Sequence, residues 1–411
     1  MKVLKCLIEI NDSSRIQFHD LIMRKEGKAL IVGRIETDNF ITLDEVGGQT
    51  IKLLLSGMTI QEVRRNIYEN RNKVIDLEDF VSGLFNIGFV QNTIEDRWPE
   101  NRIREEINAE RSWHTMLAIV GILFWFVLVM SATITYALNP NTHISFYNFI
   151  WTNNISINLI FNMSIFLMTA MFHEGFHYGS ARFFGVPAKI RVSTRLFMLV
   201  TQTEMPSLWA IGRSKRVLVL LSGMMFNLAA MSVILLLIAH VFFSFLVLSM
   251  LKAIVIILLF SVLSEFIFFT RTDVYYIIAN LTRCNNLYSD SINYLKYISS
   301  EIHNKIGLTR QIKKKENPLI LIPERERGII RYYTWFMLAG SVIFLLFMAI
   351  SFLSVTAEMI QIIYYQMLQG FQSGLILSFL EGFIALVIII LPLFLSAYLT
   401  IKQRTKEPTL S

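Results

Sequence analysis

Cysteine is scarce in this chain of 411 residues, where Cys6 and Cys284 are the only two and lie far apart. Their number and spacing exclude a disulfide framework. Charged residues are also few, at 17% compared with about 25% in an average soluble domain. Hydrophobic residues reach 54%, and this combination excludes a disordered chain and a coiled coil. The mean hydropathy of +0.51 therefore predicts a polytopic membrane protein.

Basic and acidic residues are distributed unevenly along the chain. Residues 1–112 contain 16 Lys and Arg against 19 Asp and Glu, whereas the remaining 299 residues contain 22 against 12. Nearly all apolar runs lie in this second, basic part. Basic charge in a membrane protein usually belongs to its cytosolic loops, so we expect no nucleic-acid partner. Because the N-terminus lacks a long apolar run, we also expect no cleavable signal peptide.

Six apolar runs are each about 20 residues long, which is the length that a helix needs to cross a bilayer. They lie at 115–138, 155–181, 217–240, 253–270, 332–355 and 375–401. The loops expected at 139–154 and 356–374 contain no Lys or Arg, whereas other loops are basic. The positive-inside rule therefore predicts that both termini face the cytosol. Lys252 lies in an expected outer turn, from which its long side chain can reach the interface.

The first 112 residues predict a small α+β domain on the cytosolic side. Segments 28–36 and 39–43 alternate or run apolar around a Thr-Asp turn, a pattern typical of a β-hairpin. A helix is expected at 45–55, a second begins at Thr59 with a capping-box pattern, and a third begins near Asp76. Strands followed by three short helices are typical of a winged-helix domain, although the same pattern fits a generic α+β domain.

The second apolar run contains the sequence His-Glu-Gly-Phe-His at residues 173–177. Residues four apart share one face of a helix, so the imidazoles of His173 and His177 can bind the same Zn²⁺ ion. Glu174 lies beside them and is suited to act as general base toward a metal-bound water. At 1.5 Å per residue from Ile155, His173 lies about 27 Å along the helix, near the cytosolic edge of a core about 30 Å thick.

A third ligand is needed, because catalytic zinc sites often use two histidines and one carboxylate. Acidic residues at a matching depth are few. Glu381 lies near the outer end of the last run, whereas Glu265 lies inside the fourth run and Asp273 lies just past its cytosolic end. Depth favours Asp273 and leaves Glu265 open as an alternative, because ionisable groups at membrane depth are usually functional.

These features together resemble the site-2 protease family of intramembrane zinc metallopeptidases, in particular its bacterial peptide zinc metalloprotease branch. The resemblance rests on the HExxH motif, on Ser-Gly-Met-Met-Phe-Asn at 222–227 and on Arg-Thr-Asp-Val-Tyr-Tyr at 271–276. It implies Zn²⁺ as the cofactor, with Asp273 as the third ligand beside His173 and His177. It also implies a multi-pass protein of the bacterial cell membrane, in contact with the lipid bilayer. Asn227 is expected to hold the substrate backbone, with helix packing as the alternative.

Residues 15–92 resemble a PqqD-like domain through the segments 40–44, 51–54, 56–63 and 85–90. The resemblance implies a winged helix that recognises a ribosomally made precursor peptide as a strand added along its hairpin edge. A peptide-modifying enzyme or an exporter is then expected as a further partner.

The sequence therefore predicts an intramembrane zinc metalloprotease that cleaves a bacteriocin-like or modified peptide precursor at the cytosolic edge of the membrane. We expect a recognition domain with its linker at 1–112 and a metallopeptidase core at 113–273. A basic cytosolic segment is expected at 274–331, followed by a two-span hairpin at 332–411. The loop 189–203 is expected to form either a hairpin at the membrane edge or a plain basic loop. Three other classes stay open: a non-proteolytic export or self-immunity protein, a metal transporter, and a regulatory site-2 protease of a membrane-anchored factor.

Overall fold

The computed structural model describes residues 10–27, 29–34, 37, 39–94, 103–105, 112–195, 198–267, 271–284, 286–306 and 316–406. The chain is mostly helical and forms two compact units. The first unit comprises Met1–Arg111, Ala181–Ala188 and Met205–Arg216, and the second comprises Ser112–Ser180, Lys189–Glu204 and Val217–Ser411. Cys6 lies outside the described residues.

The N-terminal domain of the first unit contains two small β-sheets. In one of them, β1 (Arg15–Phe18) pairs antiparallel with β5 (Val90–Ile94). The other has the order β4-β3-β2-β6 and consists of β2 (Leu21–Glu26), β3 (Ala29–Arg34), β4 (Asn39–Leu43) and β6 (Ile103–Glu105). The predicted hairpin is confirmed, since β3 and β4 pair antiparallel. The sequence does not reveal β1 and β2, because β1 has only four residues and β2 ends in charged ones.

Three helices complete this domain and confirm the predicted segments. They are α1 (Glu45–Leu55), α2 (Ile60–Arg71) and α3 (Leu77–Asn86). Asp44, Thr59 and Asp76 precede them, and each side chain accepts a hydrogen bond from the third backbone N–H of its helix. Thr59 and Glu62 also form the predicted capping box. α3 ends before Gly88, whose φ of +80° is the left-handed conformation that ends many helices.

The helices and sheets of this domain enclose a hydrophobic core. Its fully buried side chains include Ile16, Leu21, Ile51, Val63, Val81 and Phe89. Burial of each such aliphatic or aromatic side chain contributes about 1.5–3 kcal/mol relative to exposure. The domain therefore combines strong local helix signals with a core that holds its short strands.

Glu26, at the end of β2, binds two arginines in the first turn of α6 (Arg213–His240) within the same unit. One terminal nitrogen of Arg216 lies 2.8 Å from both carboxylate oxygens of Glu26, and Nε of Arg213 lies 2.8 Å from one of them. Arg216 is only 2% exposed and packs over the ring of Trp209. Burial opposes ionisation of Glu26, but its bonds to Arg216 and the nearby charges outweigh burial and lower its pKa below the ordinary value.

We expect Glu26→Gln to lower the stability of the protein at neutral pH by up to about 3 kcal/mol, because the buried Arg216 loses its counter-charge. The folded-state pKa of Glu26 lies below the ordinary value of 4.5. The stabilisation that ionised Glu26 gives to the folded protein is therefore fully present above pH 4.5. It is lost as the pH falls through the lower pKa that Glu26 has in the folded state. The difference in thermal unfolding temperature between wild type and variant should shrink below about pH 4. A difference that does not depend on pH would contradict this ion pair.

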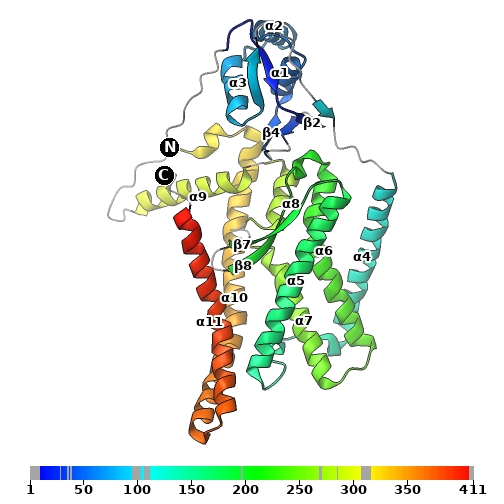
Figure 1. Cartoon of the computed structure of the whole chain (residues 1–411), viewed down its shortest axis with the longest axis vertical. Coiled ribbons are helices and arrows are strands. Elements are labelled where there is room, and N and C mark those ends of the chain that lie inside the picture. Colours follow the sequence, from blue (N-terminus) through cyan, green and yellow to red (C-terminus); the bar gives the residue numbers. More distant parts are fainter. Residues whose placement is uncertain are drawn as a thin grey trace. The chain divides into compact units, whose positions relative to one another are not determined.

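Five helices within the described residues are long and apolar enough to cross a membrane. They are α4 (Ser112–Leu138), α5 (Ile155–Phe183), α6, α7 (Phe245–Ser264) and α10 (Glu324–Ser373). The prediction of a polytopic helical membrane protein is confirmed at this level. α11 (Ile376–Lys406) begins with a shorter apolar stretch, and α8 (Asp273–Thr282) and α9 (Leu287–Ile306) lie between α7 and α10. Figure 1 shows α10 and α11 side by side as a long antiparallel pair.

The limits of two predicted spans are wrong. The fourth was expected at 253–270 but α7 covers Phe245–Ser264, so Lys252 lies inside this helix and not in an outer turn. Ser244 caps α7 by accepting a hydrogen bond from the backbone N–H of Val247, which places the turn earlier. The fifth was expected at 332–355 with an outer loop at 356–374, but α10 continues to Ser373 and ends at the left-handed Gly374. The third, expected at 217–240, lies within α6 and ends at the same residue.

A β-hairpin connects α5 to α6 and belongs to the second unit. β7 (Lys189–Arg195) pairs antiparallel with β8 (Met198–Glu204), in a register that places Ile190 opposite Thr203. Of the two interpretations of the loop 189–203, the hairpin is therefore confirmed. The hairpin places Thr203 against α5, where the candidate metal ligands lie.

Candidate metal centre

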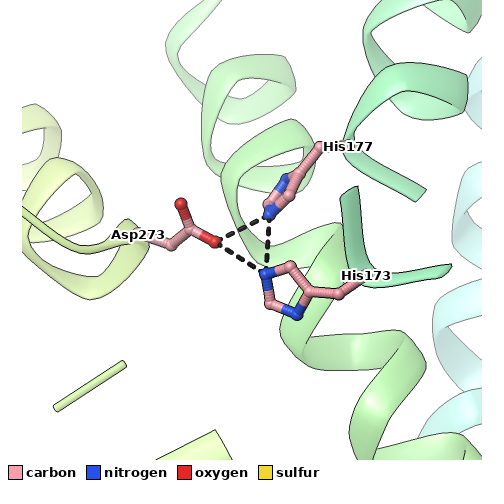
Figure 2. Close-up of side chains that lie close together, drawn as sticks. All are labelled: His173, His177 and Asp273. Carbon is pink, nitrogen blue, oxygen red and sulfur yellow. Dashed lines mark hydrogen bonds and ion pairs between the residues drawn. The ribbon is translucent and has the colours of Figure 1, made fainter. Parts of the chain in front are cut away.

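Two histidines of α5 and one aspartate of α8 converge in the second unit (Figure 2). His173 and His177 are one helical turn apart and are 6% and 2% exposed. Asp273 is the first residue of α8, so the short segment after α7 brings its carboxylate to the two imidazoles. The structure thus brings together the three residues that the sequence analysis expected to bind zinc.

The distances between the ligand atoms are suited to one metal ion. Nε2 of His173 and Nε2 of His177 lie 3.1 Å apart, and Oδ2 of Asp273 lies 3.2 Å and 2.7 Å from them. Ligand atoms that bind one tetrahedral zinc ion at about 2.0–2.1 Å lie roughly 3.3 Å apart. Two of the three separations agree with this value, and the third is that of a hydrogen bond between His177 and Asp273. The donor set of two imidazoles and one carboxylate also matches zinc chemistry.

The remaining ring nitrogens of both histidines contact polar groups of neighbouring helices. Nδ1 of His177 lies 2.8 Å from the carbonyl oxygen of Val219, to which its N–H donates when Nε2 carries the lone pair. Nδ1 of His173 and Oγ of Ser261 lie 2.9 Å and 2.8 Å from the side-chain amide of Asn227, whose Oδ1 has no hydrogen-bond partner among the described residues. With Oδ1 turned toward the ring, this amide accepts from the Nδ1–H of His173, which leaves Nε2 free to bind a metal. Such contacts orient metal-binding histidines and fix their tautomers. Asn227 is fully buried behind His173, and its expected contact with substrate stays a prediction.

Gly223 of α6 leaves the space in front of the histidines open. A Cβ atom at this position would lie 2.5 Å from Nε2 of His173 and 2.5 Å from Nε2 of His177. Real Cβ atoms essentially never approach other atoms so closely. A larger residue at this position would force the imidazoles or α6 to shift, so the close approach of α6 to the ligand atoms favours glycine here.

Glu265, the alternative third ligand, lies next to the cluster. Its Oε1 is 3.8 Å from Nε2 of His173, and its Oε2 accepts a hydrogen bond from the backbone N–H of Asp273. Oδ2 of Asp273 lies closer to both imidazoles, at 3.2 Å and 2.7 Å, than Oε1 of Glu265 lies to His173. The geometry therefore favours Asp273 over Glu265 as the carboxylate that binds a metal.

Glu174 follows the first histidine and is held by the β7–β8 hairpin. Its Oε2 lies 2.6 Å from the hydroxyl of Thr203, which donates to it. Its other carboxylate oxygen has no hydrogen-bond partner within the described part of the chain. Thr203, Ser261 and Gly223 were not predicted to act at the site. No local pattern identifies Thr203 or Ser261, because their contacts depend on how β8 and α7 pack against α5 and α6.

Glu381 and Cys284, which the sequence analysis also names, lie apart from this cluster. Glu381 accepts a hydrogen bond from Asn154, which precedes the first residue of α5 and lies 19 positions before His173. At 1.5 Å per residue this corresponds to about 28 Å along the helix. Cys284 is buried, and its thiol donates to the carbonyl oxygen of Thr282. Neither belongs to the three-residue cluster found among the described residues.

Comparisons with protein-family models, with curated proteins and with solved structures found no match to this chain. The functional argument therefore rests on the motif and on the geometry of the site.

Proposed function

We propose that this protein is an intramembrane zinc metalloendopeptidase of the site-2 protease type. The observation that carries the proposal is the buried cluster of His173, His177 and Asp273, with Glu174 adjacent on an apolar helix long enough to span a membrane. Costly ionisable groups at such a position usually serve function. Gly223 supports the proposal, because it keeps the space beside both histidines free.

In the proposed reaction His173, His177 and Asp273 hold the metal, and the chain supplies the base. A zinc ion bound there would lower the pKa of a water molecule and polarise the scissile carbonyl group. Glu174 takes the proton of that water at its free carboxylate oxygen and delivers it to the leaving amine. In a bilayer the apolar helices around the site would keep bulk water away, which would strengthen each of these electrostatic interactions.

The substrate class proposed is a ribosomally made precursor peptide that is captured by the N-terminal domain. β4 is a terminal strand of its sheet as described, and the peptide is proposed to add along it. A PqqD-like winged helix that faces the bacterial cytosol would use this edge in that way. A precursor peptide that photo-crosslinks to α3 instead of β4 would contradict the assignment.

Metal dependence of cleavage tests the function itself. The full-length protein in liposomes should cleave members of a fluorescence-quenched peptide library, lose this activity with 1,10-phenanthroline and regain it with added Zn²⁺. A protein that contains stoichiometric zinc and cleaves no peptide would overturn the proposed activity and favour a non-proteolytic export or self-immunity role. Cleavage that is unaffected by the chelator would overturn the metal assignment.

We expect Asp273→Asn to weaken zinc binding by more than about 100-fold, because it removes one of three charged or imidazole ligands. Zinc content measured by mass spectrometry after competition with a chelator reports the change. Asp290→Asn is a matched control, since Asp290 is the other aspartate of the second unit and lies on α9 away from the cluster. Equal zinc content in both variants would exclude Asp273 as a ligand and favour Glu265 as the third ligand.

A further inference from the structure

The contact between Thr203 and Glu174 joins the hairpin to the residue that carries the proposed proton transfer. Thr203 is the sixth residue of β8 and is 8% exposed. Its Oγ1 lies 2.6 Å from Oε2 of Glu174 and 3.0 Å from the backbone carbonyl oxygen of the same residue. Because the hydroxyl carries one proton, the shorter contact to the carboxylate is its main hydrogen bond.

This hydrogen bond restricts a side chain that is otherwise free to rotate. A glutamate has three side-chain torsions, and fixing such a side chain costs conformational entropy. A hydrogen bond to a carboxylate is shorter and roughly twice as strong as one between neutral groups. The bond occupies Oε2 and leaves the other oxygen of Glu174 available for a water molecule. Thr203 thus determines which oxygen of the carboxylate can act as the base.

We propose that Thr203 is a positioning residue that fixes the Glu174 carboxylate for proton transfer and links it to the β7–β8 hairpin. The proposal rests on the proposed function, because it takes Glu174 as the general base. The link has a mechanical consequence. A displacement of β8 changes the orientation of the base, so a peptide segment bound along the hairpin can influence the chemical step as well as binding.

The alternative is that Thr203 only fastens the hairpin to α5. The two roles predict different kinetics. Loss of a fastening contact would loosen the hairpin and change unfolding temperature and KM together. Loss of a positioning contact would lower kcat and leave KM, zinc content and unfolding temperature close to those of the wild type.

Thr203→Val tests the proposal, because valine has the shape of threonine but cannot donate a hydrogen bond. We expect kcat for a cleaved library peptide to fall about 10- to 100-fold. This is less than the fall expected when the general base itself is removed. Thr203→Ser keeps the hydroxyl and should restore most of the rate. Thr334→Val is the matched control, since the hydroxyl of Thr334 is also buried but donates to the carbonyl oxygen of Ile330 in α10.

Binding of acetohydroxamate provides a readout that does not depend on cleavage. This small chelator binds zinc and can hydrogen-bond to an adjacent carboxylate, so a misplaced Glu174 should weaken it several-fold in Thr203→Val. Equal kcat and equal acetohydroxamate affinity in wild type and Thr203→Val would overturn the positioning role. A wild type that binds zinc and acetohydroxamate but cleaves no peptide would instead overturn the proposed function, and the change in affinity on Thr203→Val would still decide the role of Thr203.

Discussion

Glu174→Gln is expected to reduce peptide cleavage by about 10²–10⁴-fold while zinc content stays at the wild-type level. Glutamine has the same shape and its carbonyl oxygen can still accept the hydrogen bond of Thr203, but it cannot take a proton from water. The zinc ligands are other residues, so their geometry should persist. The measurement is the initial rate on a cleavable peptide, with zinc determined on the same sample.

Glu358→Gln is the control for this substitution, since Glu358 is an exposed glutamate of α10. It should cleave like the wild type. Cleavage by Glu174→Gln at an unchanged rate would exclude Glu174 as the base. If the protein instead acts in export or self-immunity without proteolysis, its cellular phenotype should survive Glu174→Gln.

Gly223→Ala is expected to weaken zinc binding by at least about 100-fold. The added methyl group would lie 2.5 Å from the ligand nitrogens of both His173 and His177, and α6 is a continuous helix that cannot bend away locally. Alanine is favoured over glycine in a helix by up to about 1 kcal/mol, so the helix itself gains stability. Loss of zinc without loss of helix content is therefore the expected signature, read by zinc analysis and circular dichroism.

Gly179→Ala makes the matched comparison, because Gly179 lies in α5 two residues after His177 and nothing lies within 4 Å of a Cβ built there. Its zinc content should equal that of the wild type. If Gly223→Ala binds zinc with wild-type affinity, the ion does not lie in the space that Gly223 leaves beside the two histidines.

The helices of the N-terminal domain were predictable because their signals are local. The side chains of Asp44, Thr59 and Asp76 bond to backbone groups three residues away, so the sequence contains the whole contact. The strand β6 pairs with β2 from about 80 residues further along the chain. Such a pairing depends on tertiary contacts, and a segment of three residues has no recognisable period.

The residues of the candidate site also divide into those with a local sequence signal and those whose contacts depend on the tertiary fold. His173 and His177 form a local motif, since one helical turn suffices to bring them together. Asp273 lies 100 positions beyond His173, and only membrane depth and the family resemblance indicated it before the structure placed it beside them. Thr203 had no such signal, because its contact with Glu174 requires the hairpin to fold back onto α5.

The span limits show how composition misleads. Lys252 suggested a turn, but a single lysine with a long apolar stem is tolerated in α7. The segment 356–374 was expected to be a loop because it lies between two apolar runs, but it lacks proline. A helix therefore continues through it until Gly374 adopts a positive φ.

The length of α10 constrains where its ends can lie. Its 50 residues correspond to about 75 Å at 1.5 Å per residue, whereas the hydrocarbon core is about 30 Å thick. Even a helix tilted by about 40° would occupy only about 39 Å of its own length inside that core. If α10 crosses a bilayer, roughly half of its length must therefore lie in the headgroup region or in water.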